Sequence, residues 1–173
     1  WPLGLLALLA AGLAMVQARG MGINFLLSVL LLVWMADIAA YFAGRALGQR
    51  FIKVKLAPSI SPGKSWEGAL GGAVGVMLMA VLWVQCDAQR QPDSLSLFSH
   101  LAQGGWALLV LATLFLTAMS VLGDLVESLI KRSAGVKDSS QLLPGHGGVL
   151  DRIDALVPTL PLAMMLVSSV TVI

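Results

Sequence analysis

The chain has 173 residues, of which 58% are hydrophobic and 12% are charged, and its mean hydropathy is +0.88. Soluble domains contain roughly 45–50% apolar and about 25% charged residues, so this composition excludes a soluble globular protein. The net charge of +2 is uninformative as a total, and we expect no nucleic-acid partner. The single cysteine, Cys86, allows no internal disulfide.

The apolar residues occur in runs long enough to cross a bilayer. They predict five transmembrane helices, at about Trp1–Gln17, Gly22–Ala43, Trp66–Gln85, Gly104–Leu122 and Ala155–Ile173. The first run lacks the basic start and the cleavage site of a signal peptide, so we expect a helix whose upstream sequence is missing. The fold class is therefore an all-α polytopic integral membrane protein, with a single transmembrane domain over residues 1–173.

The connections between the runs differ in charge. Gly44–Ser65 carries five basic residues and no acid, whereas Cys86–Gln103 carries Arg90 against Asp87 and Asp93. The positive-inside rule places the first of these on the cytoplasmic face and the second on the opposite face. Two predicted helices separate Gly44–Ser65 from Gly123–Asp154, so both long segments are expected on the cytoplasmic face, where they form the candidate site.

Two carboxylates lie within or at the edge of the apolar runs. A charge near the centre of a membrane helix costs roughly 3 kcal/mol, so such a residue is a candidate for function. Asp37 fits a role in a site, or alternatively an ion pair with Arg45. Glu67 fits the same kind of role, or alternatively a favourable place near the positive N-terminus of its helix.

The third run also carries closely spaced glycines. Their spacing favours close helix packing, within one subunit or between two. The residues concerned are Gly68, Gly71, Gly72 and Gly75.

The segment from Gly123 to Asp154 is unlike an ordinary connection. If the fourth helix continues past the membrane, one of its faces presents Asp124, Glu127, Ser128 and Lys131. The last three follow Asp124 by three, four and seven positions, which is the spacing of one helix face. Further basic, glycine and acidic residues follow along the segment. They are Arg132, Lys137, His146, Gly147, Gly148, Asp151, Arg152 and Asp154.

This composition indicates phosphate chemistry with a divalent cation. Carboxylates are the hard oxygen ligands that Mg²⁺ prefers, and Lys and Arg neutralise phosphate oxygens. Gly147 and Gly148 let the backbone approach a ligand closely. His146 fits either a hydrogen bond to phosphate or a structural bond that shapes the turn. The alternative for the segment as a whole is a solvated loop with ordinary ion pairs.

The run Ser61–Gly68 contains Gly-Lys-Ser but is not a P-loop. That motif needs a glycine where Pro58 stands, and no hydrophobic strand precedes the run. A Gly-Lys-Ser turn that opens a helix can still bind an anion. Ser61, Lys64 and Ser65 are therefore candidate ligands for a substrate.

From Ser128 to Asp154, about sixteen positions over 27 residues resemble the signature of phosphatidate cytidylyltransferases. The matching residues include Ser128, Lys131, Arg132, Lys137, Asp138, Ser140, Leu143, Pro144, His146, Gly147, Gly148, Asp151, Arg152 and Asp154. Asp37 with Tyr41 and Gly44, the run Lys55–Pro58 and the run Ser61–Gly68 also resemble this family. The resemblance extends from about Ala36 onward, and because family members are longer, the chain looks like the C-terminal part of such an enzyme.

The resemblance implies an integral membrane enzyme that transfers CMP from CTP to phosphatidate, giving CDP-diacylglycerol and pyrophosphate. It implies Mg²⁺ held by Asp124 and Asp151, and leaves open whether a second cation binds. Glu127 and Asp154, each three residues further along the chain, are expected as further candidate ligands. The resemblance also implies a homodimer. We expect catalytic roles for Asp124, Asp151, Lys131, Arg132, Lys137 and His146, and substrate contacts from Asp37, Ser61, Lys64, Ser65, Ser128, Gly147, Gly148 and Arg152. The expected location is a bacterial inner membrane, with the site facing the cytoplasm.

Three other functions fit the sequence less well than this one. A transporter or channel would use Asp37 in an ion pathway, but it would not need the run from His146 to Asp154. A CDP-alcohol phosphotransferase would carry an aspartate-rich pattern that is absent from this sequence. A lipid-binding scaffold does not explain carboxylates that are clustered with basic residues.

Overall fold

A computed structural model describes residues 2–140, 142 and 148–171 of the chain. The elements follow in the order α1 (Pro2–Met21), α2 (Ile23–Leu47), β1 (Lys55–Ala57), β2 (Ser61–Ser65), α3 (Trp66–Arg90), α4 (Leu97–Gln103), α5 (Trp106–Ser133), α6 (Leu150–Ile153) and α7 (Leu156–Thr171). His146 and Gly147, which the sequence singled out, lie outside the described residues.

Within the described residues, five helical stretches are long and apolar enough to cross a membrane: α1, α2, α3, α5 and the stretch Leu150–Val170. This confirms the predicted fold class and the predicted number of spans. The helices α1, α2, α3 and α5 extend beyond the apolar runs, because a helix can continue into water through residues of good helix propensity. The clearest case is α5, which ends at Ser133 rather than near Leu122 and so carries the predicted polar face on regular helix.

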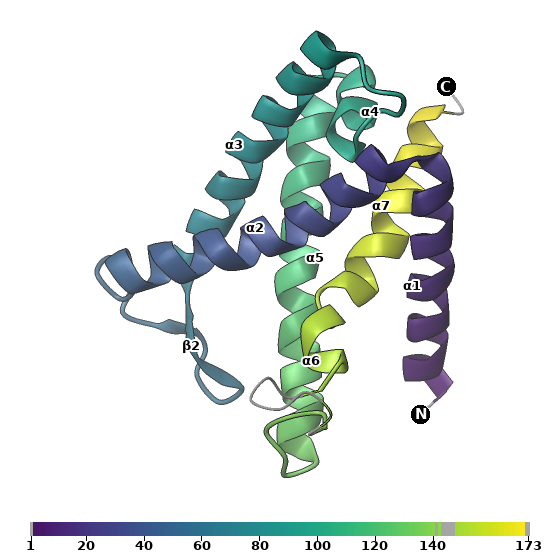
Figure 1. Cartoon of the computed structure of the whole chain (residues 1–173). Helices are drawn as coiled ribbons and strands as arrows, with labels where there is room; N and C mark the ends of the chain where they lie inside the picture. Colours follow the sequence, from purple (N-terminus) through teal and green to yellow (C-terminus); the bar gives the residue numbers. More distant parts are fainter. Residues whose placement is uncertain (1, 141, 143–147, 172–173) are drawn as a thin grey trace.

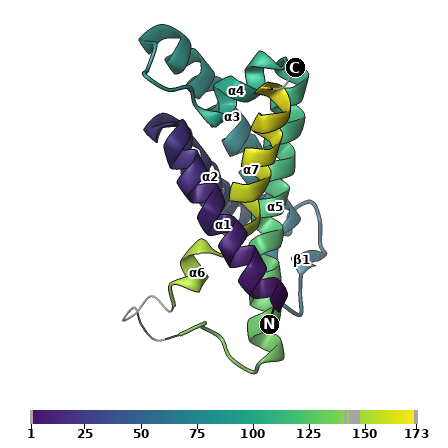
Figure 2. The same cartoon turned by 90° about the vertical axis from the view of Figure 1, so that its right-hand side faces the viewer.

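The longest helix, α5, packs against α2, α3, α4 and α7, and α1 packs against α7 and α2 (Figures 1 and 2). In both views the strands and the connection from α5 to α6 lie toward one end of the molecule, and the connection from α3 to α5, with α4, lies at the other. We refer to these ends as the site end and the far end. The predicted placement of the two long segments at one end is confirmed.

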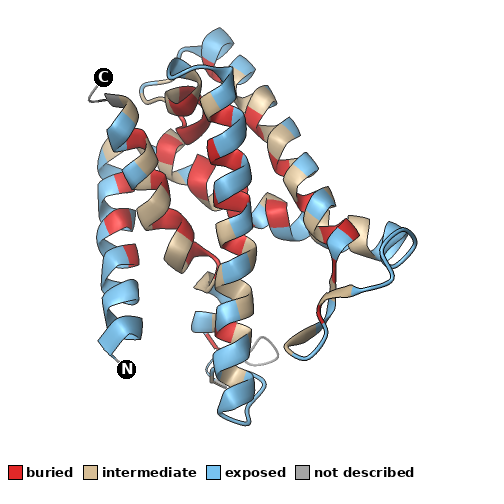
Figure 3. Ribbon diagram, turned by 180° about the vertical axis from the view of Figure 1, so that it is seen from behind, coloured by how far each residue is buried: buried red, intermediate tan, exposed pale blue. Residues whose placement is uncertain are grey.

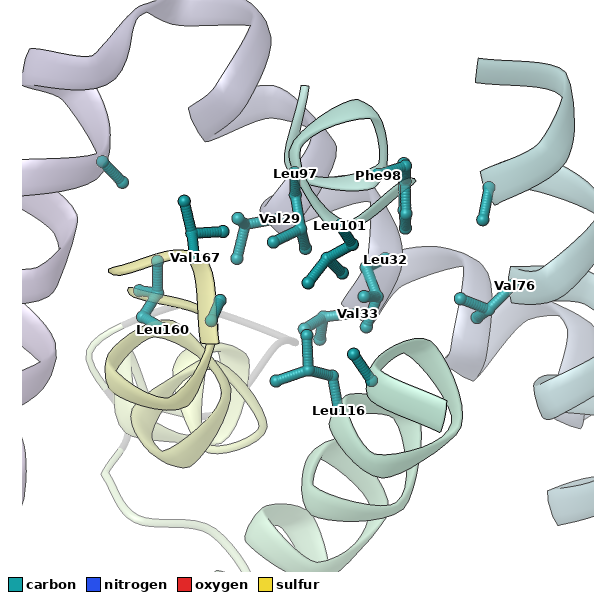
Figure 4. Packing of buried hydrophobic residues seen from close by; sticks show 14 of the residues in the cluster. Val29, Leu32, Val33, Val76, Leu97, Phe98, Leu101, Leu116, Leu160 and Val167 are labelled. Atoms are coloured by element: carbon teal, nitrogen blue, oxygen red, sulfur yellow. The ribbon is translucent and has the colours of Figure 1, made fainter. Parts of the chain in front are cut away.

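Buried side chains converge from α2, α3, α4, α5 and α7 on one apolar core (Figure 4). The helix α2 contributes Val29, Leu32 and Val33, and α4 contributes Leu97, Phe98 and Leu101. Outside this core, much of the helix surface is exposed and apolar (Figure 3), as expected where lipid replaces water.

The glycines of α3 pack against alanines of α2 in the same chain. A Cβ atom on Gly72 would lie 2.9 Å from the carbonyl oxygen of Ala36, and one on Gly75 would lie 2.5 Å from the Cβ of Ala39. Small residues on both helices therefore let the two backbones approach closely. Of the two predicted alternatives, packing within one subunit is the one that the structure shows.

The two strands form an antiparallel hairpin that the sequence did not predict. Lys55 pairs with Ser65, and Ala57 pairs with Ser61. Lys64 therefore lies on a strand, not in a turn as expected. The strands escaped prediction because three and five residues, rich in Ser, Pro and Gly, show no period-two pattern. The Ser65 side chain then caps α3 by accepting the backbone N–H of Gly68 at 3.1 Å.

At the far end, a buried carboxylate fixes the connection between α3 and α4. Asp87 is only 7% exposed and accepts hydrogen bonds from Asn24 Nδ2 at 3.0 Å, from the Ser96 backbone N–H at 3.1 Å and from Ser99 Oγ at 2.6 Å. The Trp83 indole N–H donates to Asn24 Oδ1 at 3.0 Å. Asp87 lies within α3 because the helix runs to Arg90, beyond the predicted end at Gln85.

We expect the Asp87→Ala substitution to destabilise the fold. Each buried donor left without a partner costs about 1–3 kcal/mol, so the melting temperature in detergent should fall by several degrees. Asp93→Ala is the control, because Asp93 is exposed in the same connection. Equal melting temperatures for the two variants would show that the Asp87 hydrogen bonds contribute little.

The arrangement also predicts which positions share a face of the membrane. Single cysteines replacing Lys53 and Lys137, in a Cys86→Ser background, should react alike with a membrane-impermeant reagent in sealed vesicles of one orientation. A cysteine replacing Asp93 should show the opposite accessibility. Equal labelling at positions 53 and 93 would contradict the five-span arrangement.

Candidate functional site

A cavity of about 550 Å³ lies at the site end, between α2, the hairpin and α5. Its charged and polar walls come from Asp37, Tyr41, Arg45, Lys64 and Asp124. Apolar residues complete the lining; among them are Ala40, Leu56, Ala69 and Val121. The cavity therefore combines charges of both signs with an apolar wall, which suits an amphiphilic anion.

An ion pair crosses this cavity. Lys64 Nζ, on β2, lies 2.5 Å from Asp124 Oδ2, on α5, and both side chains are partly exposed. Asp37, on α2, lies within electrostatic range of both groups. Two carboxylates held close repel unless a cation neutralises them, and the Lys64 ammonium supplies that charge here.

Gly123 lets the start of α7 and the residue Asp154, just before it, approach Asp124 closely. A Cβ atom at position 123 would lie 2.8 Å from the carbonyl oxygen of Asp154 and 2.8 Å from Cγ of Pro158. Only glycine therefore allows α5 to touch the chain at this point. Asp154 lies in turn within electrostatic range of Asp124 and Asp37. The close approach gathers three carboxylates from three helical segments.

A second charged group lies further along α5. Lys131 Nζ is 2.5 Å from Glu127 Oε2 and 2.6 Å from Asp151 Oδ1, so one ammonium neutralises two carboxylates. Glu127 is 8% exposed, and its other oxygen, Oε1, is buried with no hydrogen-bond partner among the described residues. A buried carboxylate oxygen without a partner can accept a hydrogen bond from a ligand or coordinate a cation.

Asp151 holds the two ends of the α5–α6 connection together. Its carboxylate accepts the backbone N–H of Ser139 at 3.0 Å, the Ser139 hydroxyl at 2.8 Å and the backbone N–H of Gly148 at 2.6 Å. The Lys131 contact adds a fourth donor. Asp151 therefore organises the segment predicted to bind phosphate, in addition to any role as a ligand.

The remaining sequence candidates lie around these two groups. Ser128 Oγ bonds Asp124 Oδ1 at 3.3 Å, whereas the Ser65 hydroxyl is engaged as the cap of α3. Arg132 and Lys137 are exposed beyond Lys131. Arg152 is exposed on α6, and Ser61 is partly exposed at the start of β2.

Two polar side chains of the cavity, those of Tyr41 and Arg45, were missing from the predicted site. Arg45 was considered only as a partner for Asp37, yet its Nη1 donates to Tyr41 Oη at 3.1 Å and both residues line the cavity. Among the described residues, no ion pair joins Arg45 to Asp37. The signal was available, because positions 41 and 45 follow Asp37 by four and eight residues and so share a helix face.

The donors suit magnesium, but they do not form a ready-made metal site. Within the described part of the chain, no three His, Cys, Asp or Glu side chains are close enough together to hold a metal ion. The available donors are carboxylate oxygens, the ligands that Mg²⁺ prefers. The buried Oε1 of Glu127 also fits a cation. Lys64 and Lys131 hold the positive charge beside these carboxylates.

Comparisons with known proteins agree with the resemblance in the sequence. Residues 3–170 match the model of the cytidylyltransferase family. Proteins named phosphatidate cytidylyltransferase are 49% identical over 140 residues in Haemophilus influenzae and 44% identical over 161 residues in Pseudomonas aeruginosa. These alignments cover 81% and 92% of this chain, but only 44% and 54% of the relatives.

A phosphatidate cytidylyltransferase of Staphylococcus epidermidis is 41% identical over 150 residues, covering 87% of this chain and 51% of the relative. The chain thus spans about half the length of the curated relatives it matches. The family model, in contrast, covers nearly all of the chain. The chain belongs to the cytidylyltransferase family.

Proposed function

We propose that the chain carries the catalytic site of a phosphatidate cytidylyltransferase, which transfers CMP from CTP to phosphatidate. The observation that carries this proposal is the site-end cluster, where carboxylates of α2, α5 and α6 alternate with Lys64 and Lys131 beside a partly apolar cavity. The names of the relatives support the same reaction. The reaction yields CDP-diacylglycerol and pyrophosphate.

The chemistry needs charge neutralisation more than covalent help from the protein. A phosphate oxygen of phosphatidate attacks the α-phosphorus of CTP, and the bond from this phosphorus to the oxygen of the β-phosphate breaks, releasing pyrophosphate. The attacking oxygen is already anionic, so no strong general base is needed. Lys64, Lys131 and Arg132 neutralise negative charge on the two substrates and on pyrophosphate, which lowers the barrier to in-line attack.

Mg²⁺ is part of the proposal. Asp124 and Asp151 would hold it, with Glu127 and Asp154 as further oxygen donors. When bound, the ion would neutralise phosphate charge and favour the leaving group. The structure describes no contact between Asp124 and Asp151; the second group links Asp151 to Glu127, one turn of α5 from Asp124. If phosphate oxygens accept hydrogen bonds from Lys64 and Lys131, the carboxylates that these lysines now contact would be free to bind a cation.

We further propose that the site end faces the cytoplasm of a bacterium and that the enzyme is a homodimer. The bacterial relatives support the first statement. The basic residues near the hairpin agree with it by the positive-inside rule.

Tyr41 and Arg45 face the cavity from a helix with exposed apolar neighbours, such as Ile38 and Phe42. This suits entry of phosphatidate from the bilayer.

The direct test is the reaction itself. Purified chain in mixed micelles would be given CTP, phosphatidate and Mg²⁺, and both CDP-diacylglycerol and pyrophosphate would be measured. The Pseudomonas aeruginosa relative, prepared in the same way, is the positive control. CTP binding is measured separately by calorimetry. A folded chain that neither binds CTP nor forms product, beside an active relative, would refute the proposal.

The substitution Asp124→Asn or Asp151→Asn should remove nearly all Mg²⁺-dependent turnover. The substitution keeps the size of the side chain but removes the charge that holds the cation. We expect kcat to fall by more than about tenfold, which corresponds to roughly 1.4 kcal/mol in the barrier. Binding of Mn²⁺, followed by electron paramagnetic resonance, should weaken in parallel. A variant that is folded and retains more than a tenth of wild-type kcat would show that its carboxylate is not an essential ligand.

The basic residues should contribute through substrate charge. Lys64→Ala and Arg132→Ala are each expected to lower kcat/KM at least about tenfold, because each removes a cation that stabilises the transition state. Lys53→Ala is the matched control, since Lys53 is exposed before the hairpin and does not line the cavity. Unchanged kinetics in both test variants would limit these residues to a role in membrane topology.

A further inference from the structure

We infer that Glu67 is a positioning residue, which sets the place of Lys64 by tying the segment before the hairpin to the start of α3. The inference rests on the proposed function only for the role of Lys64. Glu67 is 6% exposed, and its Oε1 accepts the backbone N–H of Phe51 at 3.1 Å and that of Ile52 at 2.8 Å. One buried carboxylate oxygen thus binds two consecutive peptide groups.

The segment held by Glu67 has little apolar anchorage of its own. Phe51 is 74% exposed and Val54 is 67% exposed, although both are large apolar residues. Ile52, between them, is 37% exposed, so hydrophobic packing holds this stretch only in part. The two bonds to Glu67 are charge-assisted, and such bonds are stronger than those between neutral groups. They are the principal described link between the stretch 51–54 and α3.

The link reaches Lys64 through the hairpin. The anchored stretch leads directly into β1, where Lys55 pairs with Ser65, the residue that follows Lys64. From the other side, the end of α2 meets the same serine, because a Cβ atom on Gly48 would lie 3.4 Å from Ser65 Oγ. Lys64 is thereby held where its ammonium reaches Asp124 across the cavity.

Glu67 acts through these contacts and not on a substrate. It is absent from the residues that line the cavity, although its neighbours Ser65 and Gly68 are among them. Its position in the first turn of α3 also places the carboxylate near the positive end of that helix, which stabilises the charged form without a lysine partner. The role of this buried acid in a membrane protein is therefore to order the loop that supports Lys64.

The first test reads the position of the loop without any assay of activity. A nitroxide attached to a cysteine that replaces Val54, in a Cys86→Ser background, reports loop mobility by electron paramagnetic resonance. Glu67→Ala should make this label markedly more mobile. Glu67→Gln retains a carbonyl acceptor for the two N–H groups and should keep the label ordered. Asp93→Ala, which removes an exposed carboxylate at the far end, is the control.

The second test is a double-mutant cycle on kcat/KM. Glu67→Ala should lower kcat/KM about tenfold when Lys64 is present, Glu67→Gln should restore most of it, and Glu67→Ala should have almost no further effect in a Lys64→Ala background. An equal loss in both backgrounds, or an unchanged label mobility in Glu67→Ala, would overturn the inference. If the chain has no cytidylyltransferase activity, the mobility result still decides whether Glu67 orders the loop.

Discussion

The close contact between α2 and α3 is the constraint on which the site depends. Glycine on one helix and alanine on the other bring the two backbones together, so that Asp37 on α2 and the strand before α3 face the same cavity. In a bilayer, association of helices is driven by van der Waals packing and not by removal of apolar surface from water. A pair of helices without bulky side chains at the contact therefore fixes the charged groups at its end more firmly than a pair of leucine-rich surfaces would.

Charge balance is the second organising principle. Carboxylates from α2, α5 and the Leu150–Val170 stretch would repel one another if they were left alone at the edge of a membrane. Lys64 forms an ion pair with Asp124, and Lys131 forms ion pairs with Glu127 and Asp151. The two lysines come from different parts of the fold, a strand and a helix. Under the proposed function, anionic substrates would compete for the same lysines. Substrate binding and release of the carboxylates are thus expected to be coupled by electrostatics alone.

The spans and the polar face of α5 could be predicted from the sequence, because bilayer thickness and helical period leave strong patterns. The signature from Ser128 to Asp154 likewise indicated the family. The hairpin could not be predicted, since its strands are short and its pairing depends on the ends of α2 and α3. Two partners were also out of reach: the contacts of Lys64 with Asp124 and of Asn24 with Asp87 are tertiary and carry no periodic signal. The bond from Arg45 to Tyr41, in contrast, joins positions four residues apart on one helix, where helical spacing indicates the contact.

The contact at Gly123 affects how the site responds to bilayers of different thickness. Helices adapt to a thicker or thinner hydrocarbon layer mainly by tilting, at a modest cost in energy. At Gly123 the backbone of α5 lies against the carbonyl of Asp154 and the ring of Pro158 with no side chain of its own between them, so we expect tilting to pivot near this point. Tilting about a pivot displaces the remote ends of the helices most and the neighbouring carboxylates least. The separation between Asp124 and Asp154 should therefore stay nearly constant as the thickness of the bilayer changes.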